Sequence, residues 1–330
     1  MKADGYAVEV DGLVKRFGEL TAVAGVSFKV DRGEVFGFLG PNGAGKTTTI
    51  NMLCTLLTPT EGSAKVNGYD IRTQKNEVRE SIGLVFQDPS LDDRLTANEN
   101  LDFHAVIYAI PASEREARKK EVLEMVDLLD RADDLVITYS GGMKRRLEIA
   151  RGLLHSPKVL FLDEPTIGLD PQTRSHIWDY IDGLKKREGN TIFLTTHYME
   201  EAEHCDRIAI IDHGKIIALD TPENLKNMVG GDVIRVKTED DAKAEVELKE
   251  RFGVNILEDR DCVCFKVERG EEFIPRVIRE LGVRIQAISL HRPTLDDVFL
   301  KLTGREIREE EADSLGDLRT FARARPPFAR

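Results

Sequence analysis

The sequence predicts an α/β protein with a mainly parallel sheet, followed by a second, smaller α+β unit. Within the first 230 residues, short runs of consecutive apolar residues alternate with helical stretches. Such runs are typical of strands that are covered on both faces. A doubled glycine then occurs in VGGD, residues 229–232, and the pattern changes after it. With 330 residues, of which 41% are hydrophobic, the chain is long enough to bury two cores.

The predicted strands of the first unit are of two kinds. Three early segments alternate apolar and polar residues and contain Gly-rich turns, which predicts antiparallel strands beside the parallel core: residues 7–17, 26–33 and 62–71. Five continuous apolar segments predict the parallel strands: residues 34–40, 81–87, 158–164, 191–197 and 207–212. Between about residues 89 and 156 no segment resembles a strand, and residues 113–132 have the spacing of an amphipathic helix. We therefore expect a helical insertion there.

The predicted domain limits are 1–230 for the first unit and 231–304 for the second. The second unit has the pattern strand, helix, one or two strands, helix, strand, helix, which resembles the ferredoxin-like fold. Residues 305–330 contain prolines and arginines without a period. We expect this segment to be a charged tail that is disordered or loosely attached, with a role at the membrane surface as the alternative.

The last predicted helix begins near Thr294, which is expected to cap it with Asp297 at the third helical position. Val298, Phe299 and Leu302 give this helix an apolar face. We expect that face to pack against the chain's own body. The alternative is a contact between the tails of two chains.

Charge and hydropathy limit the classes of partner. The formal net charge of −12 argues against nucleic acid as the main partner. No stretch approaches eighteen consecutive apolar residues, so we expect any work at a membrane to need another subunit. The N-terminal segment MKADGYAVEV lacks the basic start and the apolar core of a signal peptide. The expected location is the cytoplasm.

The segment GPNGAGKTT follows an apolar strand and opens a helix, which is the context of a phosphate-binding P-loop. Glycines let backbone N–H groups close around phosphates, while Lys46 reaches the β and γ oxygens and the Thr47 hydroxyl is offered to Mg²⁺. A flexible Gly turn is the alternative. The nucleotide-binding residues predicted here are Gly40, Pro41, Asn42, Gly43, Ala44, Gly45, Lys46, Thr47 and Thr48.

A pair of acids ends the apolar run of VLFLDEP. Adjacent carboxylates at the buried end of a strand are costly unless a cation or a proton neutralises them. We expect Asp163 to hold Mg²⁺ and Glu164 to orient the attacking water. A solvated turn would be the better interpretation of an isolated Asp-Glu pair.

A second glycine-rich helix start, TYSGGMKRRLEIARG, occurs a hundred residues after the first. Ser140, Gly141 and Gly142 precede a run with apolar residues on one side. Glycines at a helix start suggest that another group approaches the backbone closely, and an anion is the usual ligand there. The chain therefore has a second candidate phosphate cradle.

Six motifs in order, namely the P-loop, Gln87, YSGGM, VLFLDEP, Asp170 and His197, resemble the nucleotide-binding subunit of ABC transporters over residues 6 to about 225. The resemblance implies that Ser140 to Gly142 of one copy bind the γ-phosphate of ATP held by the P-loop of another. The implied unit is a homodimer with ATP and Mg²⁺ at its interface.

The resemblance also implies individual roles. Phe17 would stack on adenine, although an aromatic on an alternating strand is also a candidate core residue. Gln87 would sense Mg²⁺ and water, and Asp170 would lie in the loop that crosses the dimer. His197 would contact the γ-phosphate, whereas a lone histidine at a strand end would otherwise be a structural residue. The implied catalytic residues are Lys46, Gln87, Glu164 and His197.

Departures from the common signature are Tyr139, Met143 and Ile167, which put its packing against the dimer partner in doubt. The segments YSGGMKRRLEIA and HRPTLDDVFLKLTGRE resemble the daunorubicin-resistance type of exporter ATPase. That resemblance implies an ATPase at the cytoplasmic face of the cell membrane, paired with separate integral membrane permease subunits. The alternative is a soluble ABC-type ATPase that acts as a clamp or scaffold. A partner that binds ATP without hydrolysing it is disfavoured by the intact Lys46, Asp163, Glu164 and His197.

Overall fold

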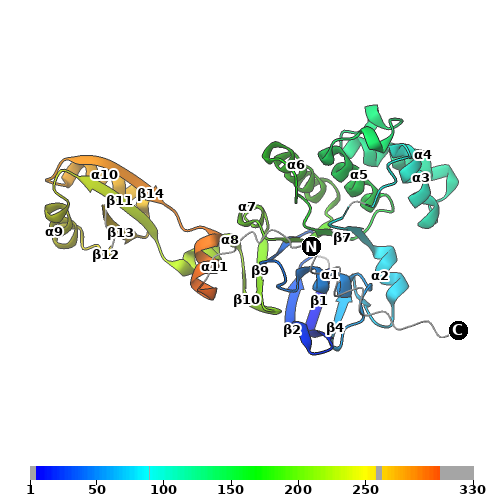
Figure 1. The fold of residues 1–330 in the computed structure, drawn as a ribbon, viewed down its shortest axis with the longest axis horizontal. Helices are drawn as coiled ribbons and strands as arrows, with labels where there is room; N and C mark the ends of the chain where they lie inside the picture. The colour runs from blue at the N-terminus through cyan, green and yellow to red at the C-terminus, as the bar shows by residue number, and fades with distance from the viewer. Residues whose placement is uncertain (1–4, 89, 258–261, 305–330) are drawn as a thin grey trace.

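The computed structural model describes residues 5–88, 90–257 and 262–304, which form three sheets and the helices around them (Figure 1). The central sheet has six strands in the order β10-β9-β3-β8-β7-β6. Its pairs are parallel except for β9 and β10. The strands are β3 (Val35–Leu39), β6 (Ile82–Val85), β7 (Val159–Asp163), β8 (Thr191–Thr196), β9 (Arg207–Asp212) and β10 (Lys215–Asp220). All five predicted parallel strands are confirmed, and β10 is an additional edge strand.

An antiparallel sheet of order β2-β1-β4-β5 packs against this central sheet. Its strands are β1 (Val8–Phe17), β2 (Leu20–Val30), β4 (Glu61–Val66) and β5 (Tyr69–Asp70). Between the sheets lies a cluster of phenylalanine rings with centroids 5.4 to 5.9 Å apart: Phe28, Phe36, Phe38, Phe161 and Phe193. Helix α1 (Lys46–Leu53) adds Ile50 and Leu53 to the same core, and α2 (Lys75–Ser81) follows β5. The predicted antiparallel strands are confirmed.

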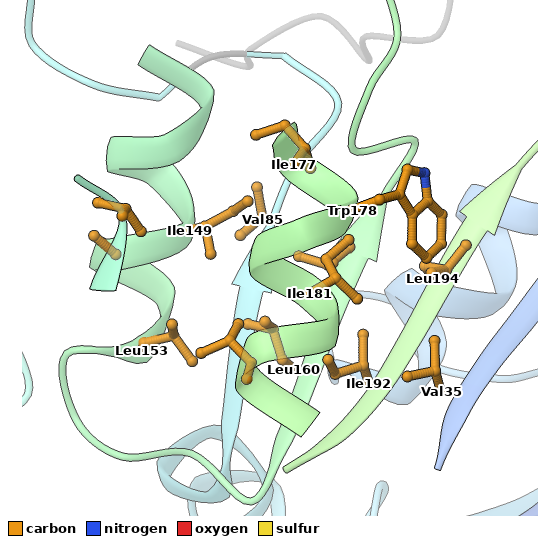
Figure 2. Packing of buried hydrophobic residues seen from close by; sticks show 14 of the residues in the cluster. Val35, Val85, Ile149, Leu153, Leu160, Ile177, Trp178, Ile181, Ile192 and Leu194 are labelled. Carbon is orange, nitrogen blue, oxygen red and sulfur yellow. The ribbon is translucent and has the colours of Figure 1, made fainter. Parts of the chain in front are cut away.

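The helical insertion lies between β6 and β7. It contains α3 (Ala97–Ile107), α4 (Ala112–Met125), the 3₁₀ turns Leu129–Arg131 and Val136–Thr138, and α5 (Gly141–Leu153). The helix predicted over residues 113–132 therefore ends earlier, at Met125. After β7 comes α6 (Pro171–Glu188). Figure 2 shows α5 and α6 on the central sheet, with Ile149 and Leu153 of α5 near Val85 and Leu160.

The C-terminal unit has its own four-stranded antiparallel sheet of order β12-β13-β11-β14. Its elements are β11 (Asp232–Thr238), α9 (Asp241–Phe252), β12 (Ile256–Leu257), β13 (Val263–Val267), α10 (Gly270–Glu280) and β14 (Ile285–His291). Ile234, Val236 and Phe265 lie in its separate core. The βαββαβ order and the strand order agree with the predicted ferredoxin-like arrangement. Figure 1 shows this unit at one end of the molecule.

The last helix, α11 (Leu295–Thr303), packs on the first unit instead. Leu295, Val298 and Phe299 are buried in the large core, where α11 meets α8 (Pro222–Val229) and α7 (Met199–Ala202). Thr294 and Asp297 form the predicted capping box. The expectation that this face packs on the chain's own body is confirmed for Val298 and Phe299. It is wrong for Leu302, which is 38% exposed.

The predicted tail, residues 305–330, lies outside the described residues. Within the described ranges, none of the helices combines the length and the apolar character that crossing a bilayer requires.

Candidate functional site

The P-loop joins β3 to α1, and its glycines are fixed by backbone geometry. Gly45 is the N-cap of α1 with φ 104°, and a Cβ there would lie 2.5 Å from the Ala22 carbonyl oxygen. A Cβ on Gly40 would lie 2.3 Å from the carbonyl oxygen of Ile211. Gly43 also has positive φ, 79°, but a Cβ there would meet nothing within 4 Å. The backbone of other segments therefore packs closely against the P-loop at Gly40 and Gly45, whereas the space beside Gly43 is open.

Lys46 is 4% exposed and bonds to the P-loop itself. Its ammonium donates to the carbonyl oxygens of Gly40 at 2.8 Å and Pro41 at 3.2 Å, and lies 3.1 Å from Glu164 Oε1. Burial lowers the pKa of Lys46, and the Glu164 carboxylate acts in the opposite direction. These contacts satisfy the hydrogen-bond donors of the ammonium.

Asp163 ends β7 and is 3% exposed. Its Oδ1 accepts from the hydroxyl of Thr195 on β8 and lies 3.3 Å from the Thr47 hydroxyl. Burial raises the pKa of Asp163, and the two hydroxyl donors act against that rise. A hydroxyl and a buried carboxylate from two segments thus meet beside the P-loop. Oxygen donors of this kind suit Mg²⁺.

Glu164 adopts left-handed backbone geometry, φ 46°, immediately after β7. Non-glycine residues rarely adopt this conformation, and it is frequent at functional sites. Its amide donates to Thr195 Oγ1 at 3.0 Å. The carboxylate lies between Lys46 and His197, with Glu164 Oε2 3.2 Å from His197 Nδ1. Among the described residues, neither of these two atoms has a hydrogen-bond partner of good geometry. Burial opposes ionisation of Glu164, but His197 and Lys46 outweigh it and lower its pKa.

His197 follows β8 directly, and the short helix α7 comes next. Within α7, Glu201 is 4% exposed and accepts hydrogen bonds from Thr166 and, at 2.7 Å, from Thr196. Glu201 therefore links the segment after Glu164 to the residue before His197. Burial raises its pKa to about 7. Sequence reasoning missed this residue, because an acid on a short helix gives no sign of burial.

The second glycine-rich segment begins α5. Ser140 caps the helix by accepting from the Met143 amide at 3.2 Å, and both Ser140 and Gly141 are exposed. Gly142 is buried, and a Cβ there would lie 2.4 Å from Cγ2 of Thr173 in α6. The group that approaches Gly142 closely is thus a threonine of the same chain. For Gly142, this threonine replaces the anion that the sequence predicts as the closely approaching group.

The departures from the common signature have local roles. Tyr139 is 5% exposed, and its hydroxyl donates to the Arg131 carbonyl oxygen at 2.6 Å. Met143, the residue that Ser140 caps, packs partly buried against the large core. Tyr139 and Met143 are therefore held within the helical part of their own chain.

The remaining predicted residues lie at the end of β1, after β6 and at the start of α6. Phe17 is 47% exposed at the end of β1, with Lys15 Nζ 5.0 Å from its ring centroid, so the core alternative is wrong. Gln87 is exposed, two residues after β6. Asp170 caps α6 by accepting from the Thr173 amide at 3.0 Å, and the hydrogen bonds from Thr173 lower its pKa. The residues that the fold brings together are Lys46, Thr47, Asp163, Glu164 and His197.

Comparison with known proteins identifies the family. The ABC transporter family model matches residues 23–167, and the model of the DrrA1-3-like ATP-binding protein C-terminal domain matches residues 221–303. Over 312 residues, 93% of this chain and 98% of the relative, the chain is 43% identical to daunorubicin resistance ATP-binding protein DrrA3 from Streptomyces coeruleorubidus. The chain belongs to the daunorubicin-resistance family of ABC ATP-binding proteins. It is an ABC ATPase with the P-loop NTPase fold and a C-terminal domain of the DrrA type.

Other members of this ABC family are similar over most of the chain. Linearmycin resistance ATP-binding protein LnrL from Bacillus subtilis is 38% identical over 92% of this chain and 100% of its own length. Nod factor export ATP-binding protein I from Burkholderia lata is 41% identical over 92% and 98%. Among solved structures, cbiO1 from Clostridium perfringens, part of the ABC transporter complex cbiONQ, has a TM-score of 0.64 and 30% identity, and covers 76% of this chain and 98% of its own.

Proposed function

We propose that this ABC ATPase drives export as a pair of identical chains, with ATP between them and separate integral membrane permease subunits as partners. The observation that carries the proposal is the cluster at the end of β7. There, Lys46 and His197 lie 3.1 and 3.2 Å from the two carboxylate oxygens of Glu164, beside the P-loop. The names of the relatives, which are resistance and export proteins, support the direction of transport.

Binding of ATP would break this cluster. The triphosphate is more negative than one carboxylate, so Lys46 exchanges Glu164 and the loop carbonyls for the β and γ oxygens. His197 turns to the γ-phosphate. Without Lys46 and His197, the Glu164 carboxylate loses the two neighbours that lower its pKa, and it can accept a hydrogen bond from the attacking water. The exposed ring of Phe17 is available to stack on adenine.

The donor set fits Mg²⁺. Within the part of the chain that the structure describes, no three His, Cys, Asp or Glu side chains group as they would around a metal ion. Thr47 and Asp163 would hold Mg²⁺ together with the phosphates and Gln87. When bound, the ion would neutralise charge that develops on the phosphoryl oxygens.

The exposed start of α5 supports the pairing of two chains. Ser140 and Gly141 are exposed at the surface of the chain. A helix N-terminus provides N–H donors and a partial positive charge, which favour a γ-phosphate presented by a second copy. Asp170 lies at the start of α6 and would form part of the same interface. One of the solved neighbours, the ATP-binding cassette MJ0796 bound to ADP and Pi, is a dimeric structure. It is 30% identical to this chain, with a TM-score of 0.59, and the match covers 65% of this chain and 98% of the neighbour.

A groove of about 690 Å³ lies between α3 and the edge of the central sheet, and it is the surface we propose for the permease. Its apolar wall includes Phe86, Phe103 and Ile107, of which Phe103 is 61% and Ile107 59% exposed. Large exposed apolar side chains beside a groove favour a protein partner. The groove borders Phe86, the residue before Gln87. Docking there would place the chain on the cytoplasmic face of the membrane.

The test is the variant Glu164→Gln, compared with Glu203→Gln directly after α7, which removes only a surface carboxylate paired with Lys226. With ATP and Mg²⁺, Glu164→Gln should form a stable dimer in sedimentation, because the phosphate contacts remain while the water loses its carboxylate. Hydrolysis should fall by about a hundredfold or more. A Glu164→Gln protein that stays monomeric and hydrolyses ATP like Glu203→Gln would refute the role of Glu164.

Purification from membranes tests the partner. The chain should be recovered with an integral membrane protein, and substitution of Phe103 by Asp should reduce that recovery without reducing ATP binding. An ATP-dependent dimer that recovers no integral membrane protein would favour the clamp or scaffold alternative.

A further inference from the structure

Arg145 lies on the sheet side of α5, one turn before Ile149. Figure 2 shows Ile149 and Leu153 packed toward Val85 and Leu160. Residues four apart share one face of a helix, so Arg145 faces the carboxyl edge of the sheet and is 6% exposed. A buried arginine at this edge is not explained by any of the motif roles above.

The guanidinium of Arg145 uses each of its N–H donors. Nε donates to the Pro165 carbonyl oxygen at 2.7 Å. Nη2 donates to the carbonyl oxygens of Asp163 at 3.1 Å and Glu164 at 3.2 Å. Nη1 donates to the Phe86 carbonyl oxygen at 2.5 Å and to Glu148 Oε2 at 3.0 Å. One side chain thus joins α5, the end of β7 and the segment after β6.

The contacts with three consecutive carbonyls concern the turn at Glu164. A residue at φ 46° is strained, and such a conformation persists only where the surroundings over-determine it. The planar fork of Arg145 binds the carbonyl oxygens of residues 163 to 165 together. The direction of the Glu164 side chain therefore depends on a residue of α5.

The remaining contacts concern the segment that carries Gln87. Arg145 holds the Phe86 carbonyl, while Glu148 Oε1 accepts from the Ser90 amide at 2.8 Å. Arg151 donates to the Ser90 carbonyl oxygen at 3.1 Å. Residues on both sides of Gln87 are thus bound to α5.

Arg145, Glu148 and Arg151 form a buried charged triad with exposures of 6%, 1% and 6%. Burial lowers the pKa of both arginines, and Glu148 acts against that change. Charged triads are an inefficient way to stabilise a core, because apolar side chains of similar volume often stabilise it as well. A role in placing the loops accounts for the triad better than a role in stability alone.

We propose that Arg145 is a positioning residue for ATP hydrolysis, which fixes the turn that aims Glu164 and couples it to the segment before Gln87. This inference rests on the proposed role of Glu164. It does not depend on a permease.

The experiment compares Arg145→Lys and Arg145→Gln with Arg146→Lys and Arg146→Gln in the full chain. Arg146 is the matched control, because it donates to the Val126 carbonyl oxygen and to the Tyr180 hydroxyl, away from the Glu164 turn. The Arg145 variants should lower kcat by about tenfold or more, and change KM and the affinity for a fluorescent ATP analogue by less than about threefold. Lysine should not restore kcat, since it has no planar fork. The Arg146 variants should leave kcat within about threefold of the wild-type value.

A second measurement separates positioning from a general loss of structure. In the Glu164→Gln background, Arg145→Gln should lower the residual rate by less than about threefold, because residues that act as a unit are not additive. The inference is overturned if kcat is unchanged, if kcat and ATP affinity fall together, or if the two substitutions multiply. If the Arg145 variants have the wild-type kcat while Glu164→Gln is inactive, the inference fails but the proposed function is retained. If Glu164→Gln is active, both the proposed role of Glu164 and the inference about Arg145 are refuted.

If the Arg145 variants do not fold, the variant Glu148→Gln tests the inference instead. This substitution keeps the shape of the side chain but breaks the ion pair with Nη1. It should lower kcat in the same direction, by about threefold or more, with KM unchanged. An unchanged kcat in a folded Glu148→Gln protein would overturn the inference.

Discussion

The two glycine-rich helix starts of this ATPase are similar in sequence but differ in how their backbone groups are satisfied. At α1, the N-cap is Gly45 and no side chain caps the helix. At α5, Ser140 caps the helix through the Met143 amide. The first N-terminus has no side-chain cap on its N–H donors, whereas the second uses one of its donors internally. Glycine is required for a different reason at each helix start. At Gly45 the backbone conformation requires it, and at Gly142 the neighbouring Thr173 leaves no room for a Cβ atom.

The largest expected effect is that of Gly45→Ala. Alanine at φ 104° is strained, and its Cβ would lie 2.5 Å from the Ala22 carbonyl oxygen, a backbone atom that cannot move aside cheaply. We expect ATP affinity to fall by about a hundredfold or more and the free energy of unfolding to fall by about 3 kcal/mol. Nucleotide titration and denaturant unfolding measure the two effects.

Gly43→Ala is the matched control, because Gly43 has positive φ but open space around its Cβ position. It should cost about 1 kcal/mol of stability from the backbone alone. Equal losses of stability in the two variants would show that the contact with Ala22 is not what distinguishes Gly45.

The second prediction sharpens the comparison at α5. Gly142→Ala should lower the free energy of unfolding by about 2 kcal/mol, because Cγ2 of Thr173 lies 2.4 Å from the new Cβ. Thr173 cannot rotate away without losing the bond from its hydroxyl to Asp170 Oδ2, 2.5 Å long. Gly141→Ala should leave stability unchanged or raise it by up to about 1 kcal/mol, since its Cβ would meet only Leu169 at 3.6 Å.

The same pair of variants distinguishes folding from pairing. In the Glu164→Gln background, Gly141→Ala should weaken the ATP-dependent dimer, because the added methyl group stands where the partner's γ-phosphate is proposed to bind. Unaffected dimerisation of Gly141→Ala would place the phosphate elsewhere.

Local patterns in the sequence predicted the elements and contacts that depend on neighbouring residues. The P-loop between β3 and α1 and the capping box of Thr294 and Asp297 are of this kind. Contacts between distant segments were not predictable in the same way. Arg145 meets the Phe86 carbonyl 59 residues away, and Glu201 meets Thr166 35 residues away. Neither arginine nor glutamate on a helix indicates by its own pattern that it will be buried.

The helix start at Ser140 shows the limit most clearly. The sequence indicated a glycine-rich start, but it could not separate a glycine kept small for Thr173 from one left open to a partner. That difference depends on where α6 lies against α5, which no local pattern encodes. The motif therefore predicted where the second glycine-rich helix start lies, but not the structural role of each residue in it.

The smallest expected effect concerns Ser140 itself. Ser140→Ala removes the cap on the Met143 amide and should lower the free energy of unfolding by about 1 kcal/mol. Ser140→Asp keeps an N-cap acceptor and should retain wild-type stability. If Ser140 faces a γ-phosphate of the second chain, the added negative charge should weaken ATP-dependent dimerisation in the Glu164→Gln background more than Ser140→Ala does. If Ser140 is only a cap, Ser140→Asp should dimerise at least as well as Ser140→Ala, so sedimentation of these two variants decides whether the second helix start serves its own chain or its partner.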